Sequence, residues 1–216
     1  MNNTVTTVRE AIEWVEIRWH DEAQSKDLPR VLLVGDSIVV GHGTPLRDTL
    51  MGQLGVDYFA TSKIVSDHEY MSDLEFMLAK YTYDVIIFNN GLHGGDVDDA
   101  IYAAALEDVL AALKKRTHHL VWRNNTPCFK RSEQKDSPIE MWVERSPKRN
   151  ELAAQVVAKL GLPTLDAFSI LRDKAGFSSD GAHFKPEGYA LLVKAEAAYL
   201  ANLINPGRSP SRIPRR

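Results

Sequence analysis

A serine near the start of the chain stands in a setting that could make it reactive. Ser37 follows the apolar run Arg30–Gly35, with Asp36 between them. An apolar run that stops at a glycine is typical of a buried strand that turns directly into the next element. Such a turn would present the Ser37 hydroxyl at the mouth of a sheet, where backbone N–H groups could stabilise an oxyanion. By itself, Gly-Asp-Ser is more often a plain turn than a catalytic one.

An aspartate and a histidine near the other end of the chain could activate that serine. Asp180 stands three positions before His183, just ahead of the helix expected from Pro186. A carboxylate can hold an imidazole through Nδ1, which fixes the tautomer and leaves Nε2 to accept a proton from a serine. A surface turn would also explain Asp-x-x-His, so the pair gains meaning only together with Ser37.

The elements that must position these residues alternate between strands and helices. Strands are expected at 30–35, 56–60, 84–88, 119–123 and 162–166, and helices at 67–80, 98–115, 147–160 and 186–204. Ser146 would cap the third helix, with Pro147 at its first position. Apolar strands of this kind are typical of a parallel sheet covered on both faces. The predicted fold class is α/β, a three-layer α/β/α sandwich with a five-stranded parallel sheet, whose sites form at the carboxyl ends of the strands.

The two ends of the chain differ from the alternating pattern. Residues 1–27 are expected to be an N-terminal helix, over 7–20, with a linker, packed on a single domain of residues 28–205. Residues 206–216 hold three prolines and four arginines without an acid. This composition predicts a disordered basic tail.

Composition narrows the class of protein. The net charge is −3, and without the four arginines of 206–216 the rest carries about −7, a poor match for phosphate backbones, so no nucleic-acid partner is expected. Cys128 is the only cysteine, which excludes an internal disulfide. Neither a signal-peptide run nor a membrane span is visible in the sequence, so we expect a cytoplasmic protein. Its oligomeric state cannot be read from the sequence.

The motifs together resemble those of the SGNH/GDSL hydrolases. Residues 28–37 resemble the family's first block, and residues 180–189 the block that carries Asp-x-x-His. Residues 84–93 parallel the third block, and 122–127 the fourth strand with its Thr-Pro end. The resemblance covers about 28–204 and implies a flavodoxin-like fold. It also implies a serine ester hydrolase that uses no cofactor and no metal.

The resemblance implies a role for each reactive residue. Ser37 would be the nucleophile, His183 its general base, and Asp180 the residue that orients His183. The oxyanion hole would take its donors from three places: the backbone N–H of Ser37, a group near Ser62, and the side chain of His93. Other residues are expected to line the site, namely Asp36, Asn90, Gly91 and Arg123.

The chain departs from the family's pattern in three places. Ile38 replaces a leucine in the first block, and His93 replaces the usual asparagine in the third. Asparagine always offers an N–H donor, whereas neutral histidine offers one N–H in one tautomer. His93 could alternatively cap its loop. The glycine of the second block has no counterpart, so Ser62 or Lys63 would supply that backbone donor.

The only indication of the substrate is the charge and polarity of the residues expected near the site. Arg123 and the polar loop at 124–137, with its basic residues Lys130, Arg131 and Lys135, suit a sugar better than a long acyl chain. We therefore expect a small-molecule or carbohydrate ester as substrate and a short-acyl esterase, specifically a carbohydrate O-acetylesterase. A lysophospholipase or thioesterase is the alternative, and a non-catalytic binding protein on the same fold is a third reading.

Overall fold

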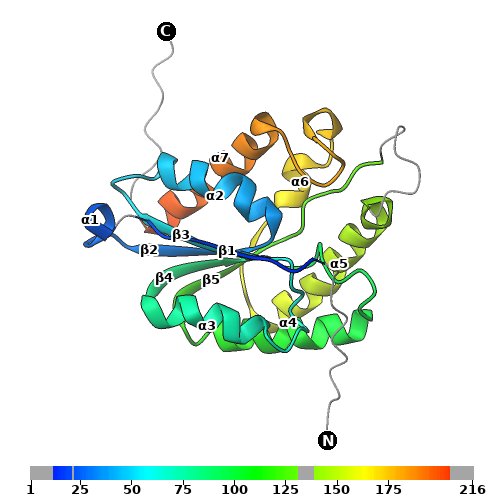
Figure 1. The fold of residues 1–216 in the computed structure, drawn as a ribbon, viewed down its shortest axis with the longest axis horizontal. Helices are drawn as coiled ribbons and strands as arrows, with labels where there is room; N and C mark the ends of the chain where they lie inside the picture. Colours follow the sequence, from blue (N-terminus) through cyan, green and yellow to red (C-terminus); the bar gives the residue numbers. More distant parts are fainter. Residues whose placement is uncertain (1–11, 21, 131–138, 205–216) are drawn as a thin grey trace, which may run out of the picture.

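A six-stranded sheet forms the centre of the molecule, which is known from a computed structural model that describes residues 12–20, 22–130 and 139–204 (Figure 1). The strand order is β1-β3-β2-β4-β5-β6. The strands are β1 (Val15–Arg18), β2 (Arg30–Gly35), β3 (Gly55–Thr61), β4 (Tyr83–Phe88), β5 (Thr117–Arg123) and β6 (Thr164–Leu165). Neighbouring strands pair in parallel except β1, which pairs with β3 in the antiparallel sense.

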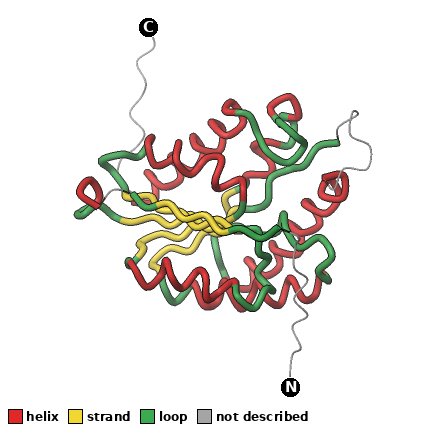
Figure 2. Tube along the Cα trace, viewed as in Figure 1, coloured by secondary structure: helices red, strands yellow, loops and turns green. Residues whose placement is uncertain are grey.

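Helices cover both faces of the sheet. They are α1 (Glu22–Ser25), α2 (Ser37–Thr49), α3 (Tyr70–Lys80), α4 (Asp99–Leu113), α5 (Ile139–Leu160), α6 (Ala167–Leu171), the 3-10 turn η1 (Ala175–Phe177) and α7 (Pro186–Ile204). Helices α2, α6 and α7 pack on one face, and α3, α4 and α5 on the other (Figure 2). The predicted α/β/α sandwich is confirmed. No helix in the described part of the chain is long and apolar enough to cross a membrane.

The register of the central strands brings their carboxyl ends to one level. Gly35 at the end of β2 pairs with Ala60 of β3, and Val34 pairs with Phe88 of β4. All six residues of β2 are buried, as its unbroken apolar sequence predicts for a central strand. The loops that follow β3, β2 and β4 therefore leave the same edge of the sheet, side by side.

The helix predicted over 7–20 is wrong for residues 12–20, which the structure describes. Val15–Arg18 forms an edge strand, so the sheet has one strand more than expected. Side chains alternate along this segment: Trp14 packs on the cluster under α2 and α7, and Ile17 packs on the opposite one. Pairing with the open edge of β3 supplies interstrand hydrogen bonds that the local helical pattern cannot provide. Residues 7–11 lie outside the described part.

The prediction that Ser146 caps a helix is also wrong. Helix α5 begins at Ile139, so Pro147 lies inside it. Proline there removes one main-chain hydrogen bond but does not end the helix. The Ser146 hydroxyl instead donates to the carbonyl of Thr126, 2.7 Å away, and ties α5 to the segment after β5. The predicted tail at 206–216 and the loop residues 131–137 lie outside the described residues.

Candidate active site

Ser37, His183 and Asp180 lie together at the carboxyl edge of the sheet. The Oγ of Ser37 is 2.7 Å from Nε2 of His183, and Nδ1 of His183 is 2.6 Å from Oδ2 of Asp180. The serine and the histidine are 146 positions apart in the sequence. The side chain of His183 is 41% exposed, so the group nearest the serine can be reached from solvent. The arrangement can move a proton from a hydroxyl to an imidazole that a carboxylate orients.

The start of α2 positions the serine. Ser37 is the first residue of this helix, and the side chain of Asp36 caps it by accepting the N–H of Ile38 at 2.9 Å. The N–H groups in the first turn of a helix have no carbonyl acceptor within the same helix. The backbone N–H of Ser37 therefore belongs to a turn that can bind negative charge.

A braced loop positions the histidine. The hydroxyl of Ser178 and the N–H of Ser179 both donate to the carbonyl of His183, at 3.1 and 2.9 Å. The N–H of Phe129, in the segment after β5, donates to the carbonyl of Gly181 at 2.8 Å. These hydrogen bonds hold the loop on two sides, immediately before α7 begins at Pro186.

Hydrogen bonds keep Asp180 charged. Burial raises the pKa of Asp180, but hydrogen bonds from the side chain and backbone of His183 and from the backbone of Ala182 outweigh that effect, so the net pKa is below its ordinary value. An ionised carboxylate at Nδ1 keeps a proton on that nitrogen. Nε2 is then free to accept the proton of Ser37.

The two N–H groups expected to complete the oxyanion hole after β3 are already bonded. The N–H of Ser62 donates to the carbonyl of Trp14 at 3.2 Å, and the N–H of Lys63 donates to the hydroxyl of Thr61 at 3.1 Å. Ser62 thus lies at the expected edge, but its backbone donor is used to hold the N-terminal segment. The sequence carries no local signal of this, because Trp14 is 48 positions away.

His93 lies in the loop after β4, at the same edge. Its imidazole packs against the indole of Trp14, with ring centroids 6.2 Å apart and planes 78° apart. Gly91 has a φ of 151°, and a Cβ there would lie 2.6 Å from Nδ2 of Asn125, so the turn leading to His93 requires glycine. The side-chain amide of Asn90 is bonded at both ends to the loop after β3: its N–H donates to the carbonyl of Lys63 at 3.0 Å, and its oxygen accepts the N–H of Val65 at 3.2 Å.

Arg123 lies behind the site, where only 2% of the residue is exposed. Its Nη1 is 3.0 Å from Nε2 of His42 and 3.3 Å from Oε1 of Glu196, and these two side chains are themselves 3.0 Å apart. We call His42, Arg123 and Glu196 the buried charge cluster. Sequence reasoning missed His42 and Glu196, although a lone glutamate on an otherwise apolar stretch of a helix is a signal that could have identified the second.

Other reactive side chains do not join the site. Burial raises the pKa of Cys128 to about 12, so this thiol stays protonated and acts as an apolar packing group. Within the described ranges, no three His, Cys, Asp or Glu side chains gather closely enough to hold a metal ion. Of the three basic loop residues, Lys130 is described and exposed, while Arg131 and Lys135 lie outside the described residues.

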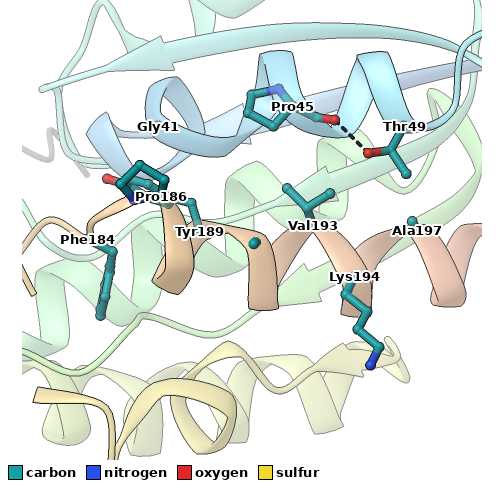
Figure 3. Close-up of a pocket in the computed structure, with 10 residues that line it drawn as sticks. Gly41, Pro45, Thr49, Phe184, Pro186, Tyr189, Val193, Lys194 and Ala197 are labelled. Atoms are coloured by element: carbon teal, nitrogen blue, oxygen red, sulfur yellow. Dashed lines mark hydrogen bonds between the residues drawn. The ribbon is translucent and has the colours of Figure 1, made fainter. Parts of the chain in front are cut away.

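An apolar cavity of about 780 Å³ lies between α2 and α7 (Figure 3). Its lining is Gly41, Pro45, Thr49, Phe184, Pro186, Tyr189, Ala190, Val193, Lys194 and Ala197. Neither Ser37 nor His183 belongs to this lining. The ring of Tyr189 packs on Gly41, where a Cβ would come within 2.1 Å of it. The cavity is therefore adjacent to the site but distinct from it.

Solved structures share this fold, although no family model and no curated protein matches the sequence. A protein from Slackia heliotrinireducens, described as a candidate SGNH hydrolase, has a TM-score of 0.63 and 18% identity over 81% of this chain and 100% of its own. The acetylxylan esterase Axe2 of Geobacillus stearothermophilus has a TM-score of 0.62 and 14% identity, covering 85% of this chain and 97% of its own. A GDSL-like lipase of Bacteroides thetaiotaomicron has a TM-score of 0.62 and 12% identity, covering 81% and 88%. At such identities the likeness establishes the fold.

Proposed function

We propose that this chain, which has the fold of the SGNH/GDSL hydrolases, is a serine ester hydrolase with Ser37 as its nucleophile. One observation carries the proposal: the hydroxyl of Ser37, the imidazole of His183 and the carboxylate of Asp180 form a continuous relay with contacts of 2.7 and 2.6 Å. A non-catalytic binding protein would have no need of such a relay in a solvent-accessible position. The fold supports the assignment, because an acetylxylan esterase shares it.

The relay supports acyl transfer to water in two steps. Nε2 of His183 accepts the proton of Ser37 as Oγ attacks the ester carbonyl, and the same proton then passes to the leaving alcohol. Water, activated by His183, releases the acyl group from Ser37 in the second step. The negative charge of Asp180 orients His183 and stabilises its protonated form between these transfers.

The backbone N–H of Ser37 and the side chain of His93 are proposed as the oxyanion donors. Ser37 begins the helix after β2 and His93 lies in the loop after β4, and these adjacent strands end at the same edge of the sheet. The N–H groups of Ser62 and Lys63 are engaged elsewhere, so we no longer assign them this role. His93 would act through a ring N–H, which makes its tautomer part of the mechanism.

A short-acyl carbohydrate ester is the proposed substrate. Support comes from the fold's likeness to an acetylxylan esterase and from the polar loop after β5. The apolar cavity between α2 and α7 does not favour a long-chain substrate, since neither Ser37 nor His183 lines it. A cytoplasmic location stays a prediction.

Hydrolysis of p-nitrophenyl acetate by the purified chain tests the function. The parent should hydrolyse this ester and react covalently with a fluorophosphonate probe, and Ser37→Ala should do neither. Ser72→Ala is a matched control that should match the parent, because Ser72 is an exposed serine of α3, on the opposite face of the sheet from α2. A parent that hydrolyses no short-acyl ester and is not labelled at Ser37 would show that the fold serves binding alone.

A further inference from the structure

The main chain of Trp14 is fixed to the end of β3. Its carbonyl accepts the N–H of Ser62 at 3.2 Å and the hydroxyl of Thr61 at 2.9 Å. Its N–H donates to Oγ of Ser62 at 3.0 Å. These three hydrogen bonds continue the pairing of β1 with β3 beyond the last paired residues, Val15 and Thr61. Trp14 therefore lies at the carboxyl edge of the sheet, where the loops of the site leave it.

The side chain of Trp14 contacts the loop after β4. In the sheet, β2 lies between β3 and β4. Trp14 is bonded to the end of β3, yet its indole packs against His93, which belongs to the loop after β4. The loops that follow these two neighbours of β2 also meet, since the N–H of Val65 donates to Oδ1 of Asn90 at 3.2 Å. Trp14 therefore lies where the two loops converge, and Ser37 follows β2, the strand between them.

The indole also lies on the correct face of the sheet. Trp14 packs on the hydrophobic cluster under α2 and α7, which includes Ile38, the residue after Ser37. Trp19, in the same segment, packs on the opposite cluster against Phe76 and Tyr81. Trp14 is only partly buried, so some of its surface remains available to a ligand.

We infer that Trp14 is a specificity-determining residue whose indole forms a wall of the substrate site and packs against the sugar ring of an acetylated carbohydrate. The inference rests on the proposed function. An acetyl group has two carbons, so contacts beyond the reacting bond fall on the alcohol part of the ester. The indole offers a rigid apolar face for the C–H groups of a sugar, and its fixed main chain and its contact with His93 limit the entropy lost on binding.

A pair of substrates isolates this contact. Acetylated xylooligosaccharides carry a sugar ring beside the ester, whereas the ethyl group of ethyl acetate is too small to cover an indole. We expect Trp14→Leu to lower the ratio of kcat/KM for the sugar ester to kcat/KM for ethyl acetate by about tenfold, mostly through KM. Trp14→Phe, which keeps an aromatic face, should lower it by about twofold to threefold. Trp19→Leu, in the same segment but on the opposite face, should leave the ratio unchanged.

The outcomes separate the two proposals. If the parent hydrolyses neither ester, the proposed function itself fails. If it hydrolyses both, and Trp14→Leu lowers both rates equally or neither, the inference fails and the function stands. Thermal unfolding establishes that each variant is folded. If Trp14→Leu does not fold, Trp14→Phe provides the test. A Trp14→Phe variant with the parent's ratio of kcat/KM for the two esters would contradict the inference that Trp14 forms a wall of the site.

Discussion

Asp180 uses its two carboxylate oxygens for different purposes. Oδ2 holds Nδ1 of His183, and Oδ1 accepts the backbone N–H groups of Ala182 and His183. The first contact sets the tautomer of the imidazole, and the second sets the shape of the loop that carries it. An amide at this position would keep much of the shape but would lose the charge that keeps the proton on Nδ1.

Asp180→Asn should therefore lower kcat by about 10⁴-fold, as expected when a triad histidine takes the wrong tautomer. The measurement is steady-state hydrolysis of p-nitrophenyl acetate, with thermal unfolding as a check of the fold. Because the pKa of Asp180 is lowered from 3.8, the carboxylate is ionised at pH 5 and above. Protonation of Asp180 should therefore not contribute to any loss of activity between pH 8 and pH 5. A variant with more than a tenth of the parental kcat would contradict the role of this residue.

His93→Ala tests the proposed oxyanion donor. Removing one such donor costs about 2.7–4 kcal/mol of transition-state stabilisation, so turnover should fall by about two to three orders of magnitude. His118→Ala, on an exposed position of β5, is the control and should match the parent. If His93→Ala were as fast as the parent, His93 would have no place in the reaction and would only pack against Trp14.

At the scale of elements, the buried charge cluster joins three parts of the fold that carry the site. His42 belongs to α2, which starts at Ser37, and Glu196 belongs to α7, which follows the loop of His183. Arg123 ends β5. Burial raises the pKa of Glu196, but His42 and Arg123 outweigh it and hold the pKa below its ordinary value. The carboxylate is thus charged in the interior, opposite a guanidinium.

Glu196→Gln should lower the free energy of unfolding by about 3–5 kcal/mol at pH 7, because it leaves a buried guanidinium without its opposite charge. Urea unfolding measures this, with the exposed Glu187→Gln on the same helix as a control within about 0.5 kcal/mol of the parent. The pKa of Glu196 is lowered from 4.5, so its contribution is fully present above pH 4.5 and is lost as pH falls through the lower folded value. The difference between parent and variant should therefore shrink on acidification. A difference that does not change with pH would contradict the assignment.

Elements with strong local patterns were predictable from the sequence, and elements that depend on a partner were not. The strand Arg30–Gly35 and the helix Pro186–Ile204 have the predicted bounds. The apolar run of the strand ends at a glycine, and the helix begins at a proline. Val15–Arg18 was read as helix, since its spacing also fits a helical face. Only the open edge of β3 makes it a strand, and no local pattern reveals that edge.

At the scale of the whole molecule, the site results from parallel topology. Ser37 and His183 were predictable as a pair because each stands in a short motif at the end of an element, and parallel strands bring such ends to one edge. The hydrogen bond that occupies the Ser62 N–H and the burial of Arg123 were not predictable. Each depends on a side chain or carbonyl far away in the sequence, Trp14 in one case and Glu196 in the other.

Pairing of β1 with β3 should also keep the molecule dispersed in solution. Ile17 lies opposite Phe59, so Ile17→Pro should disrupt the pairing, because proline lacks an N–H and fits an interior strand position poorly. When the Ile17→Pro protein is concentrated, we expect larger assemblies, measured by light scattering, and increased thioflavin T fluorescence. Ile17→Val is the control. An Ile17→Pro variant that scatters light like Ile17→Val would show that β1 has no such role.

β1 is expected to prevent aggregation because it covers the outer edge of β3. Without β1, the outer edge of the seven-residue strand β3 would offer a row of unpaired main-chain groups to any extended chain. The same few residues that place an indole against His93 thus also deny this edge to other molecules. A chain cut within this segment would lose its selectivity and its resistance to aggregation together.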